Sequence, residues 1–374
     1  MPFEISRYQP KAWSILSRSV ATERVASTYL LYGREGLGHW PLALSFAALL
    51  NCENRKRDEK SNELIPCGEC SRCRQIFAVN SPGLFVVVPI MSFDSTSEAV
   101  EFTNEILDLK RKEPFRILAA PKQTTLPIDM AREIKRHLML RETTFPKRVV
   151  LFYQMEKMLV ASADALLKLI EEPPSDTVII LTADRVSALL PTIQSRSQHI
   201  RLERVQETVA VDYLVTEYEQ SPARAKLLVR LADRNLGRAI DLVDHDDDEE
   251  SRRAVGLVLY KALFRDSNPQ LVSKVIDLLP RSDRSEAEEL MLLWQSLTRD
   301  CANYAVNGDE EELINIDFLP EIKACAARFT DSELAGAITI AIKNALADLR
   351  LNVHIRIALI AMMLRLTRLI RATH

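Results

Sequence analysis

The sequence predicts an α/β domain with a parallel sheet and helices on both of its faces, followed by helical domains. Three observations lead to this fold class. Short apolar runs alternate with helical segments between residues 29 and 202. A glycine-rich loop at residues 33–38 joins the first apolar run to a long helical segment. Beyond residue 202 the strand pattern disappears and helical spacing continues to the end of the chain. Such alternation is typical of parallel sheets.

Six apolar runs are the expected strands: residues 29–32, 84–89, 116–119, 148–153, 177–182 and 199–202. Two of the segments between them carry clear helix signals. One spans residues 128–140, begins after Pro127 and has Asp129 in its first turn. The other spans residues 161–171 and stops before Pro173.

Three domains are expected, in keeping with a length of 374 residues. Residues 1–204 hold the predicted sheet. Residues 205–248 contain several short helical segments and reach into the acidic run 244–250, which predicts a solvated linker. Residues 249–374 repeat leucine, isoleucine and alanine at helical spacing with almost no glycine, so they predict an all-helical domain.

The composition argues against strong nucleic-acid binding by the chain alone and against a membrane protein. The net charge is −3 and the pI is about 6.2, whereas phosphate affinity needs clustered Lys and Arg. Any DNA contact is therefore expected to be shared with partners. The longest apolar stretch, residues 346–370, contains four arginines, each costing about 2.5 to 3.5 kcal/mol in a bilayer. Residues 1–13 lack the apolar core of a secretory signal, so a cytoplasmic protein is expected.

The glycine-rich loop has the spacing of a phosphate-binding loop without its reactive side chains. Such a loop reads Gly-x4-Gly-Lys-Ser/Thr, in which glycine amides cradle phosphates, the lysine neutralises them and the hydroxyl binds magnesium. Gly33, Gly36 and Gly38 keep the glycine pattern. His39 stands at the lysine position and Trp40 at the hydroxyl position.

The expected strand 148–152 lacks a further part of an ATPase site. P-loop ATPases end this strand with an Asp that holds magnesium and a Glu that activates water, but Tyr153 and Gln154 follow it here. With the loop lysine and hydroxyl also missing, ATP hydrolysis is not expected. The loop is then either a plain strand-to-helix turn or a weak nucleotide or anion site formed by its amides and His39.

Four cysteines predict a structural metal site within residues 51–74. They are Cys52, Cys67, Cys70 and Cys73. The C-x2-C-x2-C half puts three thiolates within reach of one tetrahedral ion, and Cys52 can complete the set. Zinc is the expected ion, with free thiols or an iron–sulfur cluster as alternatives. Such an ion would hold together an insertion that is too polar to form its own core.

Three further motifs resemble bacterial clamp-loader AAA+ subunits. Residues 165–174 read ALLKLIEEPP, where that family has a sequence close to NALLKxLEEPP. Residues 179–182 match its sensor-1 strand, and residues 190–197 match its Ser-Arg-Cys motif, with Ser197 in the third position. The four-cysteine module is shared by hydrolysing and non-hydrolysing members of the family. The missing P-loop residues favour a non-hydrolysing member.

The resemblance implies an α/β P-loop AAA+ module with a zinc insertion at about residues 51–74, a helical lid at 205–248 and an all-α oligomerising collar at 249–374. It implies an accessory subunit that joins the ATPase subunits and delta in a five-membered ring, which loads the sliding clamp onto primed DNA. Arg196 would act as a trans arginine finger on a neighbouring ATPase subunit. Thr182 and Arg238 would occupy the sensor-1 and sensor-2 positions, and their roles would be structural or vestigial.

Two other functions stay open from the sequence. One is an ATP-hydrolysing clamp-loader subunit of the gamma/tau type, against which Tyr153 and Gln154 count. The other is a zinc-dependent nucleic-acid-binding module, which the acidic charge balance does not favour. For Arg196, a local ion pair is the alternative to the finger.

Overall fold

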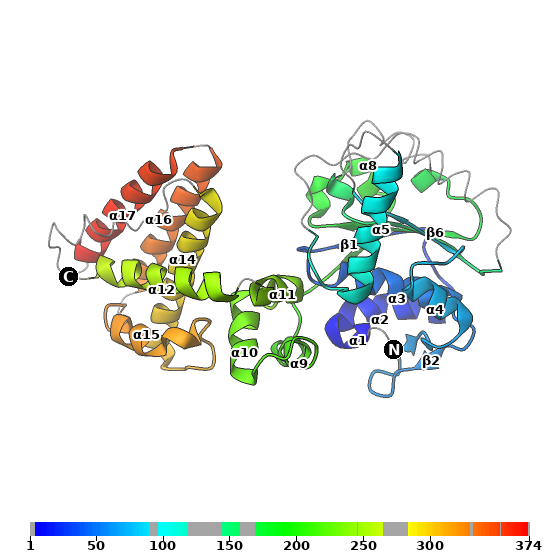
Figure 1. Ribbon diagram of the computed structural model, residues 1–374, viewed down its shortest axis with the longest axis horizontal. Helices are drawn as coiled ribbons and strands as arrows, with labels where there is room; N and C mark the ends of the chain where they lie inside the picture. Colours follow the sequence, from blue (N-terminus) through cyan, green and yellow to red (C-terminus); the bar gives the residue numbers. More distant parts are fainter. Residues whose placement is uncertain are drawn as a thin grey trace. The chain divides into compact units, whose positions relative to one another are not determined.

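The structure is a computed structural model that describes residues 4–89, 96–118, 144–157, 169–244, 246–264, 283–329, 332–351 and 353–372. The chain forms two compact units, shown in Figure 1. The first contains residues up to 222 together with 232–241, and the second contains residues 223–231 together with 242 onward. Within the described ranges, no helix has the length and apolar content needed to cross a membrane.

Five parallel strands form the sheet of the first unit, in the order β4-β5-β6-β1-β7. Their bounds are β1 Thr28–Tyr32, β4 Leu84–Val87, β5 Arg148–Phe152, β6 Thr177–Ala183 and β7 Gln198–Arg201. Strand β1 lies between β6 and β7 and pairs Leu30 with Leu181 of β6 and with His199 of β7. The predicted parallel sheet is confirmed. Because all strands run the same way, the loop after β1 lies at the carboxyl edge of the sheet, where ligands bind in α/β folds.

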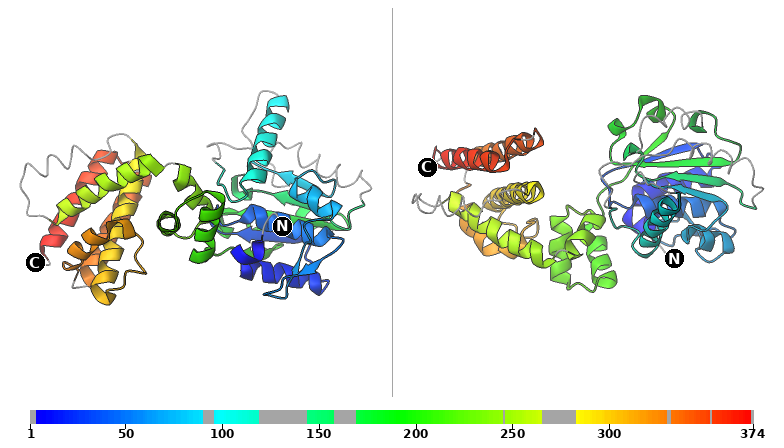
Figure 2. Two further views of the ribbon diagram at one scale, coloured as in Figure 1. Left: turned by 60° about the horizontal axis from the view of Figure 1, so that its bottom comes forward. Right: turned by 45° about the horizontal axis from the view of Figure 1, so that its top comes forward.

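Both faces of the sheet are buried, as the sequence predicts. Tyr29 and Leu31 belong to one apolar cluster and Leu30 to another, because successive strand side chains point to opposite faces. On the first face lie α1 (Ile5–Tyr8), α2 (Pro10–Ala21), α3 (His39–Asn51) and α4 (Ser71–Phe77), the blue helices of Figures 1 and 2. On the other face Ile170 and Ile193 pack, the latter from α8 (Pro191–Gln194).

Helix α3 is buried along its whole length, from His39 to Asn51. It follows the glycine loop directly and fills the space beneath β1. A helix that is apolar on every side is typical of the interior of a large domain. The remaining elements of the unit are α5 (Thr96–Lys112), α9 (Glu207–Glu217), α11 (Leu236–Asp244), the hairpin β2 (Lys56–Arg57) and β3 (Leu64–Ile65), and the 3₁₀ helices η1 (Met155–Lys157) and η3 (Val186–Ala188).

Two sequence predictions are wrong and others fall outside the described residues. Residues 116–118 form no strand; the Arg116 carbonyl accepts a hydrogen bond from the buried Lys110 instead. The expected acidic linker is helical from Asp246, where α12 (Asp246–Leu263) begins, because acidic residues are favourable in the first turn of a helix. The expected helix 128–140 and residues 161–168 of the helix 161–171 lie outside the described residues.

The second unit is helical throughout its described residues. Its helices are α10 (Pro222–Leu231), α12, α14 (Arg284–Asn307), η4 (Ile316–Phe318), α15 (Leu319–Ala326), α16 (Ser332–Arg350) and α17 (Ile355–Ala372). Trp294 is fully buried at its centre, and its indole N–H donates to the Gly256 carbonyl at 2.9 Å. The division into domains at residues 204 and 248 stays a prediction.

A buried carboxylate organises the connection after α14. Asp300 is fully buried and accepts hydrogen bonds from the backbone N–H of Ile314 at 3.0 Å and of Asn315 at 2.8 Å. The Asn315 side-chain amide donates to the same carboxylate at 2.8 Å. Three donors thus depend on one side chain, and buried donors without a partner are costly.

We expect Asp300→Ala to lower the free energy of unfolding of the second unit by about 3 kcal/mol, because three donors lose their acceptor. Asp300→Asn keeps one acceptor oxygen and should lose less. Glu312→Ala, an exposed neighbour, is the control and should change stability by less than about 0.5 kcal/mol. Differential scanning calorimetry measures the three variants. Equal stabilities for Asp300→Ala and the control would show that this network contributes nothing.

Candidate functional site

The glycine loop leaves β1 at Gly33 and enters α3 at His39. Gly36 and Gly38 have φ angles of 88° and 105°, a left-handed region that favours glycine. Gly38 is the N-cap residue of α3. The backbone therefore turns from strand to helix as in a phosphate-binding loop, and the glycine pattern is explained by this turn alone.

The residues at the lysine and hydroxyl positions of the loop belong to the protein core. His39 and Trp40 are 4% and 1% exposed. The Trp40 ring meets the Tyr153 ring edge-on, with centroids 5.4 Å apart. The cavity bounded by the loop and the ends of β5 and β6 has a volume of about 10 Å³, which is at most the space of one water molecule. A phosphoryl group does not fit into it.

A buried network of charged and polar groups lies beside the glycine loop and fills the site. Lys110 of α5 is 1% exposed, and its ammonium donates to the Tyr153 hydroxyl at 2.9 Å. The Tyr153 hydroxyl donates to the Glu35 carboxylate at 3.2 Å, and the backbone N–H of Leu118 donates to the same oxygen at 3.3 Å. The Lys157 ammonium lies 3.7 Å from the other oxygen. The two ammonium groups are thus engaged with the protein's own carboxylate and hydroxyl.

Burial determines the protonation of this network. It lowers the pKa of His39 to about 3, with a further lowering by Lys110, while a hydrogen bond with the Gly33 backbone opposes the shift. The imidazole is therefore neutral at pH 7 and supplies no charge to a phosphate. Burial also lowers the pKa of Lys110 to about 8, although Glu35 raises it. Burial raises the pKa of Tyr153 well above its usual value.

The residue predicted to occupy the sensor-1 position bonds to the backbone through its hydroxyl. Thr182 is 1% exposed, and its Oγ1 accepts a hydrogen bond from the Gln154 N–H at 2.8 Å. Gln154 itself has a left-handed φ of 56°. Asp184, at the end of β6, accepts a hydrogen bond from the Glu35 N–H at 3.0 Å. These contacts tie the ends of β5 and β6 to each other and to the loop.

Helix α11 closes the loop from the other side. The Gly237 N–H donates to the Gly36 carbonyl at 3.0 Å, and the Asn235 side-chain amide donates to the Glu35 carbonyl at 2.6 Å. A Cβ atom on Gly237 would lie 2.5 Å from the Gly36 Cα, so the two backbones touch. Arg238, at the sensor-2 position, is exposed and lines neither of the cavities beside the loop.

Arg196 lies at the opposite edge of the sheet. It precedes β7, which runs parallel to β1, whereas the glycine loop follows β1. Its guanidinium is 43% exposed, lies 3.1 Å from the Glu171 carboxylate and donates to the Thr192 carbonyl at 3.2 Å. Exposed pairs of this kind contribute about 1 kcal/mol at most. Ser195 and Ser197 donate to the carbonyls of their own turn. Arg196 therefore faces solvent and cannot reach its own loop.

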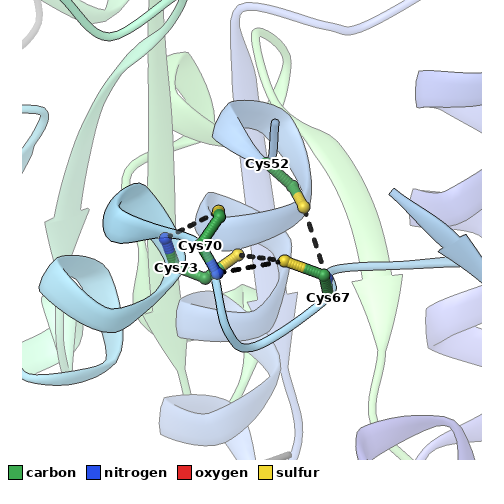
Figure 3. A group of neighbouring side chains, drawn as sticks. All are labelled: Cys52, Cys67, Cys70 and Cys73. Carbon is green, nitrogen blue, oxygen red and sulfur yellow. Dashed lines mark hydrogen bonds between the residues drawn. The ribbon is translucent and has the colours of Figure 1, made fainter. Parts of the chain in front are cut away.

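The four predicted metal ligands come together, as Figure 3 shows. Cys52 ends α3, Cys67 lies in the loop after β3, and Cys70 and Cys73 belong to the start of α4. Their sulfur atoms all lie within 4.8 Å of one another, with 3.9 Å between those of Cys67 and Cys73. One ion with metal–sulfur bonds of about 2.3 Å spaces four tetrahedral sulfurs by about 3.8 Å. The geometry therefore fits a single metal ion.

Backbone hydrogen bonds prepare the sulfur atoms to carry negative charge. The N–H groups of Cys67, Cys70 and Cys73 donate to the sulfurs of the preceding members of the cluster at 3.3, 3.3 and 3.4 Å. Burial raises the pKa of Cys67, but hydrogen bonds from the Cys70 and Glu69 backbone outweigh it and lower that pKa to about 7. Burial raises the pKa of Cys52 and of Cys73. A bound cation would stabilise all four thiolates.

Comparison with known proteins identifies the family to which the chain belongs. Residues 8–206, more than half of the chain, match the family model described as DNA polymerase III, delta subunit. The chain belongs to the DNA polymerase III delta prime family of clamp-loader subunits. It is 25% identical to the DNA polymerase III subunit delta prime of Bacillus subtilis, over 94% of each chain. It is 29% identical to that of Pseudomonas aeruginosa, over 59% of this chain and 56% of the relative.

Among solved structures, the chain is similar to a DNA polymerase III gamma subunit-related protein from Thermotoga maritima. The sequence identity is 15% and the TM-score is 0.37, over 96% of this chain and all of that one. The AAA+ fold class is carried instead by the first unit itself. Its strand order places the loop strand β1 between β6, which carries the predicted sensor-1 residue, and β7, and the four-cysteine insertion follows α3.

Sequence reasoning missed the groups that close the loop. Lys110 belongs to a basic run at the end of α5, and such a run predicts an exposed helix end. Glu35 is a loop residue in a position where any side chain is tolerated. Asn235 and Gly237 are about 200 residues away in sequence, and only the fold brings them to the loop. No local signal points to these contacts.

The buried neutral His39 predicts a specific loss of stability in acid. Its folded pKa of about 3 lies below the usual value of 6.5, so the unfolded chain binds the proton first. Its stabilising contribution is complete above pH 6.5 and decreases as the pH falls toward 3. We expect wild type to lose about 2 to 3 kcal/mol more than His39→Gln between pH 6.5 and 4.5. Urea unfolding of both proteins across this range measures the difference; parallel pH profiles would show that His39 is not buried neutral.

Proposed function

We propose that the chain is the non-hydrolysing delta prime-type subunit of a cytoplasmic DNA polymerase III clamp loader. It would join the ATPase subunits and delta in a five-membered ring that loads the sliding clamp onto primed DNA. The single observation that carries this proposal is the closed phosphate site. Its cavity of about 10 Å³ is bounded by His39, Tyr153 and Glu35, and Trp40 packs against Tyr153.

The three-domain organisation is part of the proposal. Residues 1–204 would be the AAA+ module, 205–248 the lid and 249–374 the collar through which the ring assembles. The family assignment and the parallel sheet support the first of these. The helical core around Trp294 supports a separate C-terminal domain.

Within this ring, Arg196 would be the arginine finger for the adjacent ATPase subunit. Its guanidinium is exposed and always charged, and among the described residues it pairs with the Glu171 carboxylate at 3.1 Å. Because Arg196 and the glycine loop lie at opposite edges of the sheet, the arginine would serve another chain's nucleotide. A guanidinium supplied in trans stabilises the charge that develops on the transferred phosphoryl group, and it is worth roughly 10³ to 10⁵ in rate.

We expect the purified chain to hydrolyse no ATP and Arg196→Ala to suppress hydrolysis by its partners. In a complex reconstituted with the cognate ATPase subunits, delta, clamp and primed DNA, the stimulated ATPase rate should fall at least about tenfold. The complex itself should still assemble, as size-exclusion chromatography would show, because the Arg196 pair is exposed and weak.

Two matched variants separate the finger from a local ion pair. Glu171→Gln removes the same ion pair but leaves the guanidinium, so the rate should stay within about twofold of wild type. Arg18→Ala removes an exposed arginine from α2 and should have no effect. If Glu171→Gln reproduced the loss of Arg196→Ala, the arginine would be structural. ATP turnover by the isolated chain would instead favour a hydrolysing gamma/tau-type subunit.

Zinc is the proposed ion for Cys52, Cys67, Cys70 and Cys73. Four thiolates in a closed tetrahedral arrangement suit zinc, and they leave no open position for water or substrate. The ion would supply cross-linking only. It would tie the end of α3 to the start of α4 and hold the hairpin β2–β3 between them.

Metal analysis of the purified chain should find about one zinc ion per molecule. Cys70→Ser should release it and lower the melting temperature of the first unit, because metal binding stabilises the folded insertion. Cys325→Ser, which changes a half-buried cysteine outside the cluster, should keep the zinc. Iron in place of zinc, or zinc that survives Cys70→Ser, would contradict the assignment.

A further inference from the structure

A second cavity lies next to the closed phosphate site, and its walls are rich in arginine. It has a volume of about 910 Å³ and opens at the carboxyl ends of β1, β6 and β7, beside the turn that precedes α11. Five arginines line it: Arg34, Arg185, Arg201, Arg204 and Arg234. Three carboxylates also line it, so the lining of the cavity carries more positive than negative side chains. The chain as a whole has a net charge of −3.

The acidic side chains of this cavity already have partners. Glu203 pairs with Lys11 at 2.9 Å, and Asp233 pairs with Arg204 at 2.6 Å and with Arg34 at 3.7 Å. Asp184 accepts the Glu35 N–H.

Three of the five arginines remain unneutralised. Arg185, Arg201 and Arg234 are exposed and form no ion pair with a carboxylate in the described part of the chain. Three unpaired guanidinium groups around one cavity favour an anion inside it.

The turn that carries Arg234 has an unfavourable backbone. Asp233 and Arg234 have consecutive left-handed φ angles of 56° and 58°. For an arginine this conformation costs roughly 1 to 2 kcal/mol. The Arg234 carbonyl accepts the Val205 N–H at 3.1 Å, which fixes the turn against the segment after β7. Backbone strain that the surrounding structure maintains is typical of binding sites.

Three amides of the glycine loop beside this cavity already have acceptors within the protein. The N–H groups of Gly33, Glu35 and Leu37 donate to protein oxygens at 3.0, 3.0 and 3.4 Å. These three amides are therefore not available to a triphosphate, and the adjacent cavity of about 10 Å³ is too small for a phosphoryl group. What remains is a set of side-chain charges on several elements, which suits phosphates spaced along a chain.

We propose that this cavity binds the phosphodiester backbone of single-stranded nucleic acid through Arg185, Arg201 and Arg234. The inference does not depend on ring assembly or on Arg196. It predicts weak, salt-dependent binding by the isolated chain, in keeping with its negative net charge. Three phosphate contacts to a single strand give a slope of about −2 in log K against log salt concentration.

Fluorescence anisotropy with a labelled oligothymidylate of about 20 nucleotides tests the proposal on the full chain. Wild type should bind with a dissociation constant in the micromolar range at about 50 mM salt. The double variant Arg201→Glu/Arg234→Glu should bind at least about tenfold more weakly, with a slope nearer to zero than −1. Unchanged thermal unfolding and zinc content would show that this variant is folded.

The matched control is Arg18→Glu/Arg24→Glu, which makes the same charge change on exposed residues before β1, at the opposite edge of the sheet. It should weaken binding by about twofold or less. Equal losses in both double variants, or no binding by wild type, would overturn the proposal. Loss of binding in Cys70→Ser alone would assign it to the cysteine module instead.

A competition experiment with ATP tells whether the cavity binds a polymer or a free nucleotide. Unlabelled ATP, with and without magnesium, should fail to displace the strand at equal phosphate concentration. If ATP displaced the oligonucleotide from wild type but did not bind the Arg201→Glu/Arg234→Glu variant, the ligand of the cavity would be a free nucleotide and the proposal of a single strand would be wrong. None of these outcomes bears on the Arg196 experiment, so the two proposals fail separately.

Discussion

The burial of helix α3 on every side is the constraint on which the rest of the first unit depends. This helix begins at the glycine loop and ends at Cys52, so one element connects the phosphate loop to the cysteine cluster. A helix enclosed by core accepts only apolar or neutral side chains unless a buried charge is paired. His39 meets this condition as a neutral imidazole and Trp40 as an indole. A lysine at position 39 would add a second ammonium near Lys110, so the closed site and the buried helix are consequences of the same packing.

The loop is also held by the protein itself where other P-loops are held by nucleotide. Gly36 and Gly237 touch through their backbones, Asn235 binds the Glu35 carbonyl, and Asp184 binds the Glu35 N–H. Of these contacts, the one to Asp184 occupies an N–H that a phosphate would otherwise use, and the other two fix the loop through its carbonyls and its backbone. A loop fixed in this way keeps one conformation without nucleotide, since no binding energy is needed to order it. Such rigidity suits the proposed role of a subunit that serves its neighbour's site.

The sequence predicts the sheet and the cysteine cluster well, for physical reasons that do not extend to the closure of the loop. Parallel strands buried on both faces give continuous apolar runs, and ligand spacing in the cluster is local. The run at residues 116–119 fails because a short apolar run fits a buried connection as well as a strand. Lys110 and Gly237 escape detection because their partners are distant in sequence. Local sequence patterns indicate which secondary structure a segment can form. The closure of the glycine loop depends instead on contacts between segments that are distant in sequence.

The polarity of a parallel sheet then separates the two cationic features of the first unit. Residues that follow strands gather at one edge and residues that precede them at the other. Arg196 precedes β7 and pairs with the exposed carboxylate of Glu171, an arrangement that suits the proposed role of a finger for one phosphoryl group on another chain. Arg201 ends the same strand and shares its cavity with Arg185 and Arg234, so it can meet several charges along a polymer. The four residues of β7 therefore separate the proposed arginine finger from the proposed strand-binding cavity.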